Sequence, residues 1–461
     1  MTAAPAHRPM SIEELEALAD HVVELVRSTP TAADVEVEAN VRIDRIRHGL
    51  TRFANSFIHQ HVGEDTVTVS LTVAVDGRTA SASTTAVDDS ALRGLIGTTI
   101  ESAALQPVDP HWPGATPPSE VDLLGHSDEP TAHATPEQRA ELVKAFVDTG
   151  LELRAAGFID TEGLWSAFAS TAGQRCSGAT TRATIDGIHQ TGRSAGSAHQ
   201  TSLRLSDLAA AEAGERAADR ARRSEQFSDV EPGSYEVVLG PEAVCTILTF
   251  LTFYGFNAKS HLEGSSFAEL GEQQFDPAFT LMDDPADPRA VGLPFDAEGS
   301  PRQHYTLVDR GVTRSLAHDR RTAKRSGTTT TGNALPGGEG LGAFPVNLLM
   351  RGGDTPPDDL VSQVERGLLI TQFHYVRVLD PKSVVATGLT RNGTFLIEDG
   401  KVGDAVGNLR FTQSFVTALG EGKVLGIGDD ARYADGEFGP GMVICPTLRL
   451  AEWSFTGGAR G

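Results

Sequence analysis

Apolar residues recur at the spacing of amphipathic helices in several parts of the chain. From Ser11 to Arg27 they fall near helical spacing, and Ser11 with Glu14 makes a capping box. Helices are also expected from about Ser90 to Ala104 and, in a charged and alanine-rich stretch, from Ser206 to about Gln226. The first half of the chain is therefore expected to contain long helices.

A further helix is expected to begin after Thr135, which caps it. Pro136 takes its first position, where a missing N–H costs nothing, and Gly157 is expected to end it. The predicted buried stripe of this helix comprises Leu142, Val143, Phe146, Val147 and Leu151.

Alternation of apolar and polar residues predicts strands between these helices. From Thr66 to Val75, valine and leucine share one face while threonine, serine and alanine share the other. Asp76-Gly77 then turns the chain into Arg78 to Thr85, which indicates a β-hairpin. An earlier strand is expected around residues 35–43, and short strands with glycine turns from about 158 to 204.

Beyond residue 229 the sequence becomes glycine-rich and mostly β. One clear helix opens at Pro241 and is apolar nearly all round, so we expect it inside a core. Three pairs, Arg310-Gly311, Asn392-Gly393 and Asp399-Gly400, are expected to form hairpin turns in an antiparallel sheet.

These patterns predict an α+β protein. An N-terminal tail and helix cover residues 1–32, and a C-terminal domain, mainly antiparallel β with one buried helix, covers 229–461. Between them lies an N-terminal α/β domain with antiparallel hairpins and long helices (33–228), divided into a first part (33–105), a linker (106–134) and a middle part (135–228).

Composition and charge narrow the classes of function. The 461 residues include 62 acidic and 39 basic ones, giving a net charge of −23, so nucleic acid is not expected as a partner. No apolar run approaches the length of a membrane span, and no secretory signal is recognisable at the start. Three scattered cysteines, Cys176, Cys245 and Cys445, suit a reducing compartment, so we expect a cytoplasmic protein.

No motif completes an active site by itself. The chain has 14 histidines but no His-Glu dipeptide, which excludes an HExxH or HExxxH zinc helix. His59 and His61 would share one face of a strand, but no third ligand is spaced to complete a metal site. Nucleophile elbows, Walker loops and CxxC pairs are absent, and Cys445 lies in an apolar strand typical of a core.

Seven short phrases stand in a fixed order along the chain, from about residue 33 to 455. They are VAVDGRTASASTT (73–85), GSYEVVLGPEA (233–243), HLEGSSF (261–267), FDAEGSP (295–301), LVDRG (307–311), TGLTRNGTFLIEDG (387–400) and NLRFTQS (408–414), with PTLR (446–449) near the end. Together they resemble the TldD/PmbA family. Each phrase is weak alone, but seven in the right order make chance improbable.

The resemblance also locates a missing zinc motif. Zinc-bearing TldD-type members carry HExxxH directly before a Gly-Leu-Glu-Gly phrase, and Leu262-Glu263-Gly264 anchors that phrase here. The two histidine positions are then Gly255 and Ser260, and Phe256 replaces the glutamate that activates water. The resemblance therefore implies a PmbA/TldE-type subunit with no catalytic residues and no metal or cofactor of its own.

Such a subunit is expected to form a heterodimer with a TldD-type subunit that supplies zinc. The pair would degrade or mature unfolded peptides, which would add as an extended strand to a sheet edge. Candidates for lining the substrate or partner channel are His261, Glu263, His304, His374 and Arg391.

Two other functions stay open. A specialised-pathway enzyme would reuse the fold for non-zinc amide or small-molecule chemistry, and a stand-alone peptide-binding module would need no catalytic partner. The enzyme's candidate groups are His261, Glu263, His304, His318, His374 and Cys445. No spacing ties these groups together, so a structural role is expected for each.

Overall fold

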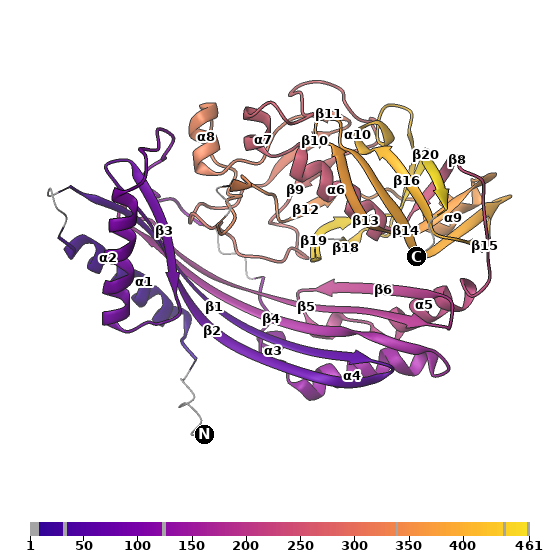
Figure 1. Cartoon of the computed structure of the whole chain (residues 1–461), viewed down its shortest axis with the longest axis horizontal. Helices are drawn as coiled ribbons and strands as arrows, with labels where there is room; N and C mark the ends of the chain where they lie inside the picture. The colour runs from indigo at the N-terminus through magenta and orange to yellow at the C-terminus, as the bar shows by residue number, and fades with distance from the viewer. Residues whose placement is uncertain (1–8, 31–34, 122–125, 338–339, 437–438, 459–461) are drawn as a thin grey trace.

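The first half of the chain builds a long, curved antiparallel sheet of six strands, in the order β3-β2-β1-β4-β5-β6. The computed structural model describes residues 9–30, 35–121, 126–337, 340–436 and 439–458. Figure 1 shows the sheet curving beneath the C-terminal half of the chain. Its strands are β1 (Val37–Ala54), β2 (Phe57–Val75), β3 (Arg78–Thr84), β4 (Arg154–Ser170), β5 (Arg175–Gln190) and β6 (Ala195–Ser202).

Four helices cover the face of this sheet that is turned away from the C-terminal half (Figure 1). α1 (Ile12–Ser28) and α2 (Asp89–Ala104) share one core with the sheet, and α4 (Pro136–Val147) and α5 (Ala210–Arg223) share a second. Shorter elements connect them: α3 (Glu129–Ala132) and the 3-10 turns η1 (Asp148–Gly150) and η2 (Leu205–Asp207). Alternate residues of β2 are fully buried against α1 and α2, as the period of two predicts.

The predicted helix starts after Ser11 and Thr135 are confirmed, whereas the helix predicted from Ser206 begins at Ala210, after a 3-10 turn, and one predicted end is wrong. Ser11 and Thr135 both cap their helices in reciprocal capping boxes. The helix that starts at Pro136 ends at Val147, and Leu151 is 77% exposed instead of buried. Gly157 lies inside β4, where a Cβ atom would come 2.2 Å from the Asp186 carbonyl oxygen, so this glycine permits close strand contact. The strands after it are long, with 17 residues in β4 and 16 in β5, and not short as predicted.

Two sheets and a buried helix form the C-terminal half. An eight-stranded sheet has the order β13-β8-β20-β16-β14-β15-β7, with β17 on β20, and a six-stranded sheet has the order β11-β10-β9-β12-β19-β18. α6 (Pro241–Tyr254) packs against strands of both sheets and is buried along most of its length, as its all-round apolar surface predicts.

The bounds of the remaining strands and helices are β7 (Phe227–Ser228), β8 (Gly233–Leu239), β9 (Leu281–Asp283), β10 (Tyr305–Asp309), β11 (Val312–Thr313), β12 (Leu348–Met350), β13 (Arg366–Asp380), β14 (Val385–Glu398), β15 (Lys401–Val406), β16 (Leu409–Ser414), β17 (Val424–Ile427), β18 (Arg432–Gly436), β19 (Gly439–Cys445), β20 (Leu448–Gly458), α7 (Ala258–Leu262), α8 (Arg320–Ser326), α9 (Pro357–Ser362) and α10 (Phe415–Ala418).

Two of the three predicted hairpin turns are confirmed. Arg310-Gly311 joins β10 to β11, and Asp399-Gly400 joins β14 to β15. The prediction for Asn392-Gly393 is wrong, because both residues lie inside β14. Ile370 on β13 pairs with Thr394 on β14, and the next pair is Gln372 with Arg391. One residue lies between these pairs on β13 and two lie between them on β14, so β14 holds one extra residue. Positive φ angles at Asn392 and Gly393 therefore form a β-bulge, not a turn.

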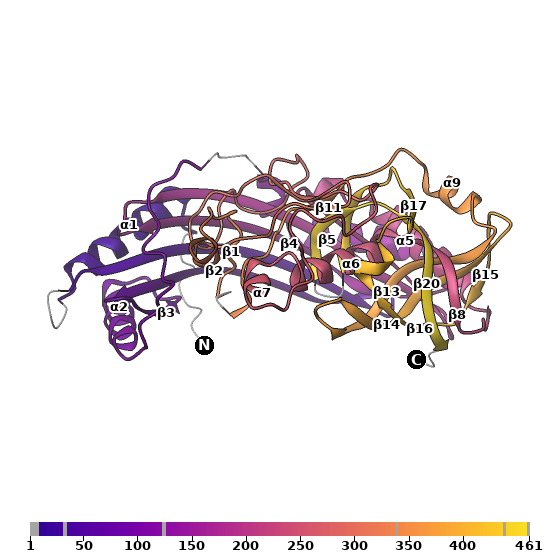
Figure 2. The same ribbon diagram turned by 90° about the horizontal axis from the view of Figure 1, so that it is seen from above.

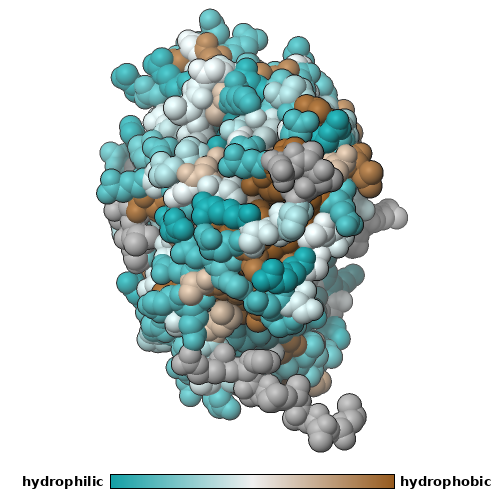
Figure 3. Space-filling model, turned by 90° about the vertical axis from the view of Figure 1, so that its left-hand side faces the viewer, coloured by the Kyte–Doolittle hydropathy of each residue, from teal (hydrophilic) through white to brown (hydrophobic). Residues whose placement is uncertain are grey.

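The C-terminal half lies on the concave face of the first sheet (Figures 1 and 2). β6 contacts β14 and β18 across the junction. The α+β class is thus confirmed, while the domain boundary at residue 229 stays a prediction. None of the described helices has both the length and the apolar character that crossing a bilayer requires. Hydrophilic residues cover most of the end that carries α1 and α2 (Figure 3).

Candidate functional site

A cavity of about 300 Å³ lies where the first sheet meets the C-terminal half. β5 and β6 contribute one side of its lining, and the first turns of α6, with β13, β14 and β18, contribute the other. Much of the lining is charged or titratable, including Asp186, His199, Arg220, Glu242, Arg391 and Asp435. A cavity at the junction of two units is a common position for a binding site.

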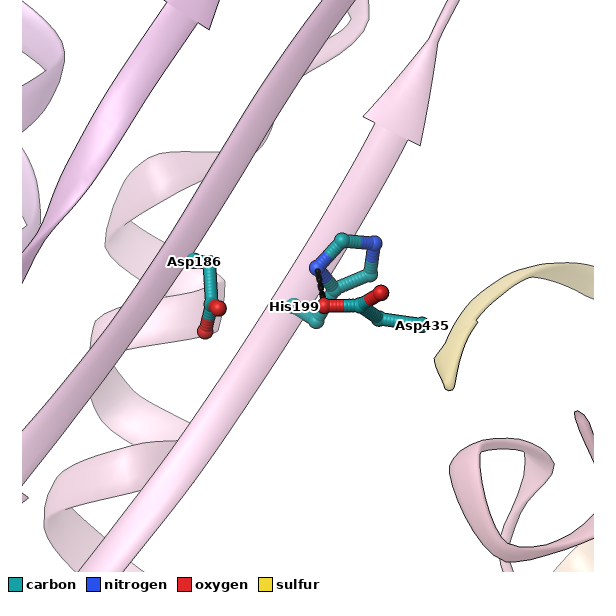
Figure 4. Close-up of side chains that lie close together, drawn as sticks. All are labelled: Asp186, His199 and Asp435. Carbon is teal, nitrogen blue, oxygen red and sulfur yellow. Dashed lines mark ion pairs between the residues drawn. The ribbon is translucent and has the colours of Figure 1, made fainter. Parts of the chain in front are cut away.

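Three of these side chains meet at one point. Asp186 on β5 pairs in register with His199 on β6, so both project from the same face of the sheet. Asp435 on β18 approaches from the C-terminal half, and its Oδ2 lies 3.2 Å from His199 Nδ1 (Figure 4). Within the described parts of the chain, this is the one group of three or more His, Cys, Asp or Glu side chains whose ligand atoms lie within 4.8 Å of one another.

Burial sets the protonation of the three groups. Loss of water raises the pKa of Asp186 to about 6. The same effect, reinforced by the charges of Asp186 and Glu242, raises the pKa of Asp435 to about 8. Burial also lowers the pKa of His199 to about 3. At neutral pH, when no cation is bound beside these groups, the His199 imidazole is neutral and the Asp435 carboxyl group keeps its proton.

A buried ion pair stands beside this group. Arg432 donates to Glu242 Oε1 at 2.6 Å, and Glu242 lies in the first turn of α6 with 7% of its surface exposed. Burial alone would raise the pKa of Glu242, but the charges of Arg432 and Arg220 outweigh it and lower this pKa. The second carboxylate oxygen, Oε2, has no hydrogen-bond partner among the described residues. The cavity therefore holds an ionised carboxylate with one unused acceptor atom.

Two of the five predicted channel residues line the cavity. Arg391 on β14 donates to His374 on β13, with 2.5 Å between Nη1 and Nε2. The other three lie elsewhere: His261 is exposed on α7, Glu263 forms a salt bridge at the end of that helix, and His304 forms one with an aspartate at 3.0 Å. The structure thus brings together His374 and Arg391 and leaves the rest apart.

The positions of the degenerate zinc motif lie in and beside an aromatic core. Phe256 is fully buried, with its ring 5.3 Å from Phe267 and 6.2 Å from Phe275. A Cβ atom added to Gly255 would lie 1.9 Å from Phe267 Cε1, so an imidazole does not fit there. Ser260 follows on α7 with a hydroxyl side chain. At these three positions the side chains present are not zinc ligands, and Phe267 takes the space beside Gly255.

Sequence reasoning missed Asp186, His199, Glu242 and Asp435. No motif spacing links them, because two come from adjacent strands of the first sheet and two from separate elements of the C-terminal half. The one local signal is a charged residue on an inward-facing strand position, as Asp186 is in β5. A charged side chain at such a position needs a partner to offset its charge, but the sequence does not identify the partner residue.

Solved structures share this fold over nearly the whole chain. A putative modulator of a DNA gyrase from Thermotoga maritima aligns with a TM-score of 0.83 at 19% identity, covering 96% of this chain and 100% of that one. TldE from Thermococcus kodakarensis aligns with a TM-score of 0.83 at 16% identity, covering 97% and 100%. The fold is therefore that of the TldE-like proteins.

Sequence comparison then gives the family. The model of the PmbA/TldA metallopeptidase C-terminal domain matches residues 232–457. A metalloprotease from Methanothermobacter thermautotrophicus is 26% identical over 342 residues, which is 68% of this chain and 73% of the relative. A metalloprotease TldD homolog from Haemophilus influenzae is 29% identical over 179 residues, 37% of this chain and 36% of the homolog. The chain belongs to the TldD/PmbA family.

Proposed function

We propose that this chain is the non-catalytic, TldE-like subunit of a heterodimeric TldD/TldE-type zinc metallopeptidase that degrades or matures unfolded peptides, and that it holds no catalytic zinc ion of its own. One observation carries the proposal: an aromatic core fills the space beside Gly255, which corresponds to one of the two histidine ligands of zinc-bearing members. Phe256 occupies the place of the water-activating glutamate, and the ring of Phe267 occupies the space that a side chain at Gly255 would need. The catalytic zinc would then belong to a TldD-type partner.

The contribution of this chain would be to hold peptide. Arg391 and His374 stand together at the cavity, and the guanidinium group is suited to a peptide carbonyl or a terminal carboxylate. β3 is an end strand of the first sheet, and such an edge pairs with an extended chain through backbone hydrogen bonds that are insensitive to sequence. Its three cysteines are unpaired, which supports a cytoplasmic location.

The test is reconstitution with a TldD-type subunit. We expect the two chains to co-purify, and we expect only the pair to cleave an unfolded peptide, with activity lost on chelation and restored by Zn²⁺. In the pair, Arg391→Ala should raise KM by about tenfold with little change in kcat, because it removes one charged contact to the peptide. Arg93→Ala, on the outer face of α2, is the matched control and should change neither constant.

Cleavage of peptide by this chain alone would overturn the proposal. Turnover that is insensitive to chelators and independent of a TldD-type subunit would instead favour the specialised-pathway enzyme.

A further inference from the structure

The group formed by Asp186, His199 and Asp435 has a feature that a structural salt bridge lacks. His199 is 5% exposed, yet its Nδ1 atom has no hydrogen-bond partner among the described residues. The 3.2 Å contact with Asp435 Oδ2 does not have hydrogen-bond geometry, and Oδ1 of Asp435 is also without a partner. Buried polar atoms are almost always paired, so two unused atoms at one point indicate a missing ligand.

The other ring nitrogen fixes how His199 presents Nδ1. Nε2 lies 3.0 Å from the Thr201 hydroxyl, which in turn lies 2.9 Å from the Thr184 hydroxyl. In the tautomer in which Nε2–H donates to Thr201, the Thr201 hydroxyl donates to Thr184. Nδ1 then carries a lone pair directed into the group. A metal-ligating histidine commonly makes such a bond through its second nitrogen.

The distances suit one shared ion. The 3.2 Å between His199 Nδ1 and Asp435 Oδ2 is close to the ~3.4 Å that separates two ligands of a tetrahedral ion with bonds of ~2.1 Å. Asp186 completes the group within 4.8 Å, so its carboxylate would have to turn toward the ion to bind it. Figure 4 shows that the ring edge bearing Nδ1 and both carboxylates face a common space.

The charges also favour a cation. Two carboxyl groups and an imidazole share a space that already contains the Glu242 carboxylate. A divalent ion would offset the repulsion between these carboxylates, and it would bind them and the imidazole directly.

We propose that Asp186, His199 and Asp435 bind one divalent transition-metal ion at the wall of the cavity. One imidazole with two carboxylates is a ligand set for Zn²⁺, Mn²⁺ or Fe²⁺, and the remaining coordination positions face the cavity. Because β5 and β6 belong to the first sheet and β18 to the C-terminal half, the ion would cross-link the two halves. This proposal requires no TldD-type partner and is separate from the positions of the missing zinc motif.

The test uses the full chain alone, stripped with EDTA, desalted and titrated calorimetrically with ZnCl₂ and with MnCl₂. We expect one equivalent of metal per chain, confirmed by elemental analysis after dialysis, and a higher melting temperature on loading, because the ion binds only the folded arrangement. His199→Gln and Asp435→Asn should each weaken binding roughly a hundredfold, since each removes one of three ligands. His21→Ala is the control. It removes a surface histidine whose Nε2 lies 2.8 Å from Asp89 Oδ1, and it should leave metal binding unchanged.

Both ligand variants are checked by circular dichroism, because Asn and Gln keep the size of the group and the fold is expected to survive. Wild-type protein that binds neither ion more tightly than about 100 μM would overturn the proposal, as would binding that both variants leave unchanged. A peptide assay on the metal-loaded chain separates this proposal from the proposed function. Cleavage by the loaded chain alone would refute the non-catalytic subunit and leave the metal site standing.

Discussion

The aromatic core around Gly255 makes the loss of the zinc motif testable by one substitution, Gly255→Ala. The backbone at this position has φ −114° and ψ −55°, which alanine adopts freely, so the change adds only a methyl group. That methyl carbon would stand 1.9 Å from Phe267 Cε1 and 2.3 Å from its Cζ. Ordinary contacts between carbon atoms begin near ~3.5 Å, so the ring or the helix end must move by about 1.5 Å.

The ring has little room to move. Phe267 packs edge-on against Phe256 at 5.3 Å and against Phe275 at 5.9 Å, and all three side chains are buried. Overpacking of this kind costs about 1–3 kcal/mol, and the lower chain entropy of unfolded alanine offsets about 0.5 kcal/mol of that. We therefore expect Gly255→Ala to destabilise the C-terminal half by about 2 kcal/mol.

Hydrogen exchange followed by mass spectrometry measures this loss of stability segment by segment. Amides of the α6–α7 region that exchange by opening of this core should exchange about thirtyfold faster, since a tenfold change corresponds to ~1.4 kcal/mol. Gly94→Ala on the exposed face of α2, where a Cβ atom meets nothing within 4 Å, is the control and should slightly stabilise its helix. Combining Gly255→Ala with Phe267→Leu should recover part of the loss. Unchanged exchange in Gly255→Ala would refute the reasoning, because position 255 would then tolerate a side chain.

Two further predictions concern the buried charges. Asp435 has a folded pKa of about 8 against 3.8 for the free side chain, so the folded state keeps a proton that the unfolded state loses, and stability falls as pH rises from about 4 to 8. Asp435→Asn should therefore increase the free energy of unfolding more at pH 8 than at pH 5, by on the order of 2 kcal/mol, because water reaches one-fifth of the side chain and screens its charge. An equal gain in chemical denaturation at both pH values would contradict this. Arg432→Met leaves the Glu242 carboxylate buried without its partner and should cost about 3 kcal/mol in chemical denaturation. Arg222→Met, at a pair whose side chains are 47% and 60% exposed, should cost less than about 1 kcal/mol, and similar losses in the two variants would contradict the burial of Glu242.

The local signals in the sequence predicted local structure well. The capping boxes at Ser11 and Thr135 start their helices where expected, and Asp76-Gly77 turns β2 into β3. The helix from Pro136 ends at Val147 and gives way to the 3-10 turn Asp148–Gly150, which leaves Leu151 exposed. The Asn392-Gly393 pair became a bulge because its preference for positive φ serves a bulge as well as a turn.

The sequence by itself determined the α+β class, the buried helix at Pro241 and the absence of a zinc-binding helix, because each depends on residues close together in the chain. The meeting of Asp186, His199 and Asp435 was decided only by the tertiary structure. Their positions depend on strand register and on how the C-terminal half seats on the concave sheet, and these are set by the packing of whole cores. The aromatic cluster that fills the space beside Gly255 arises in the same way, from segments that the sequence does not show to be neighbours.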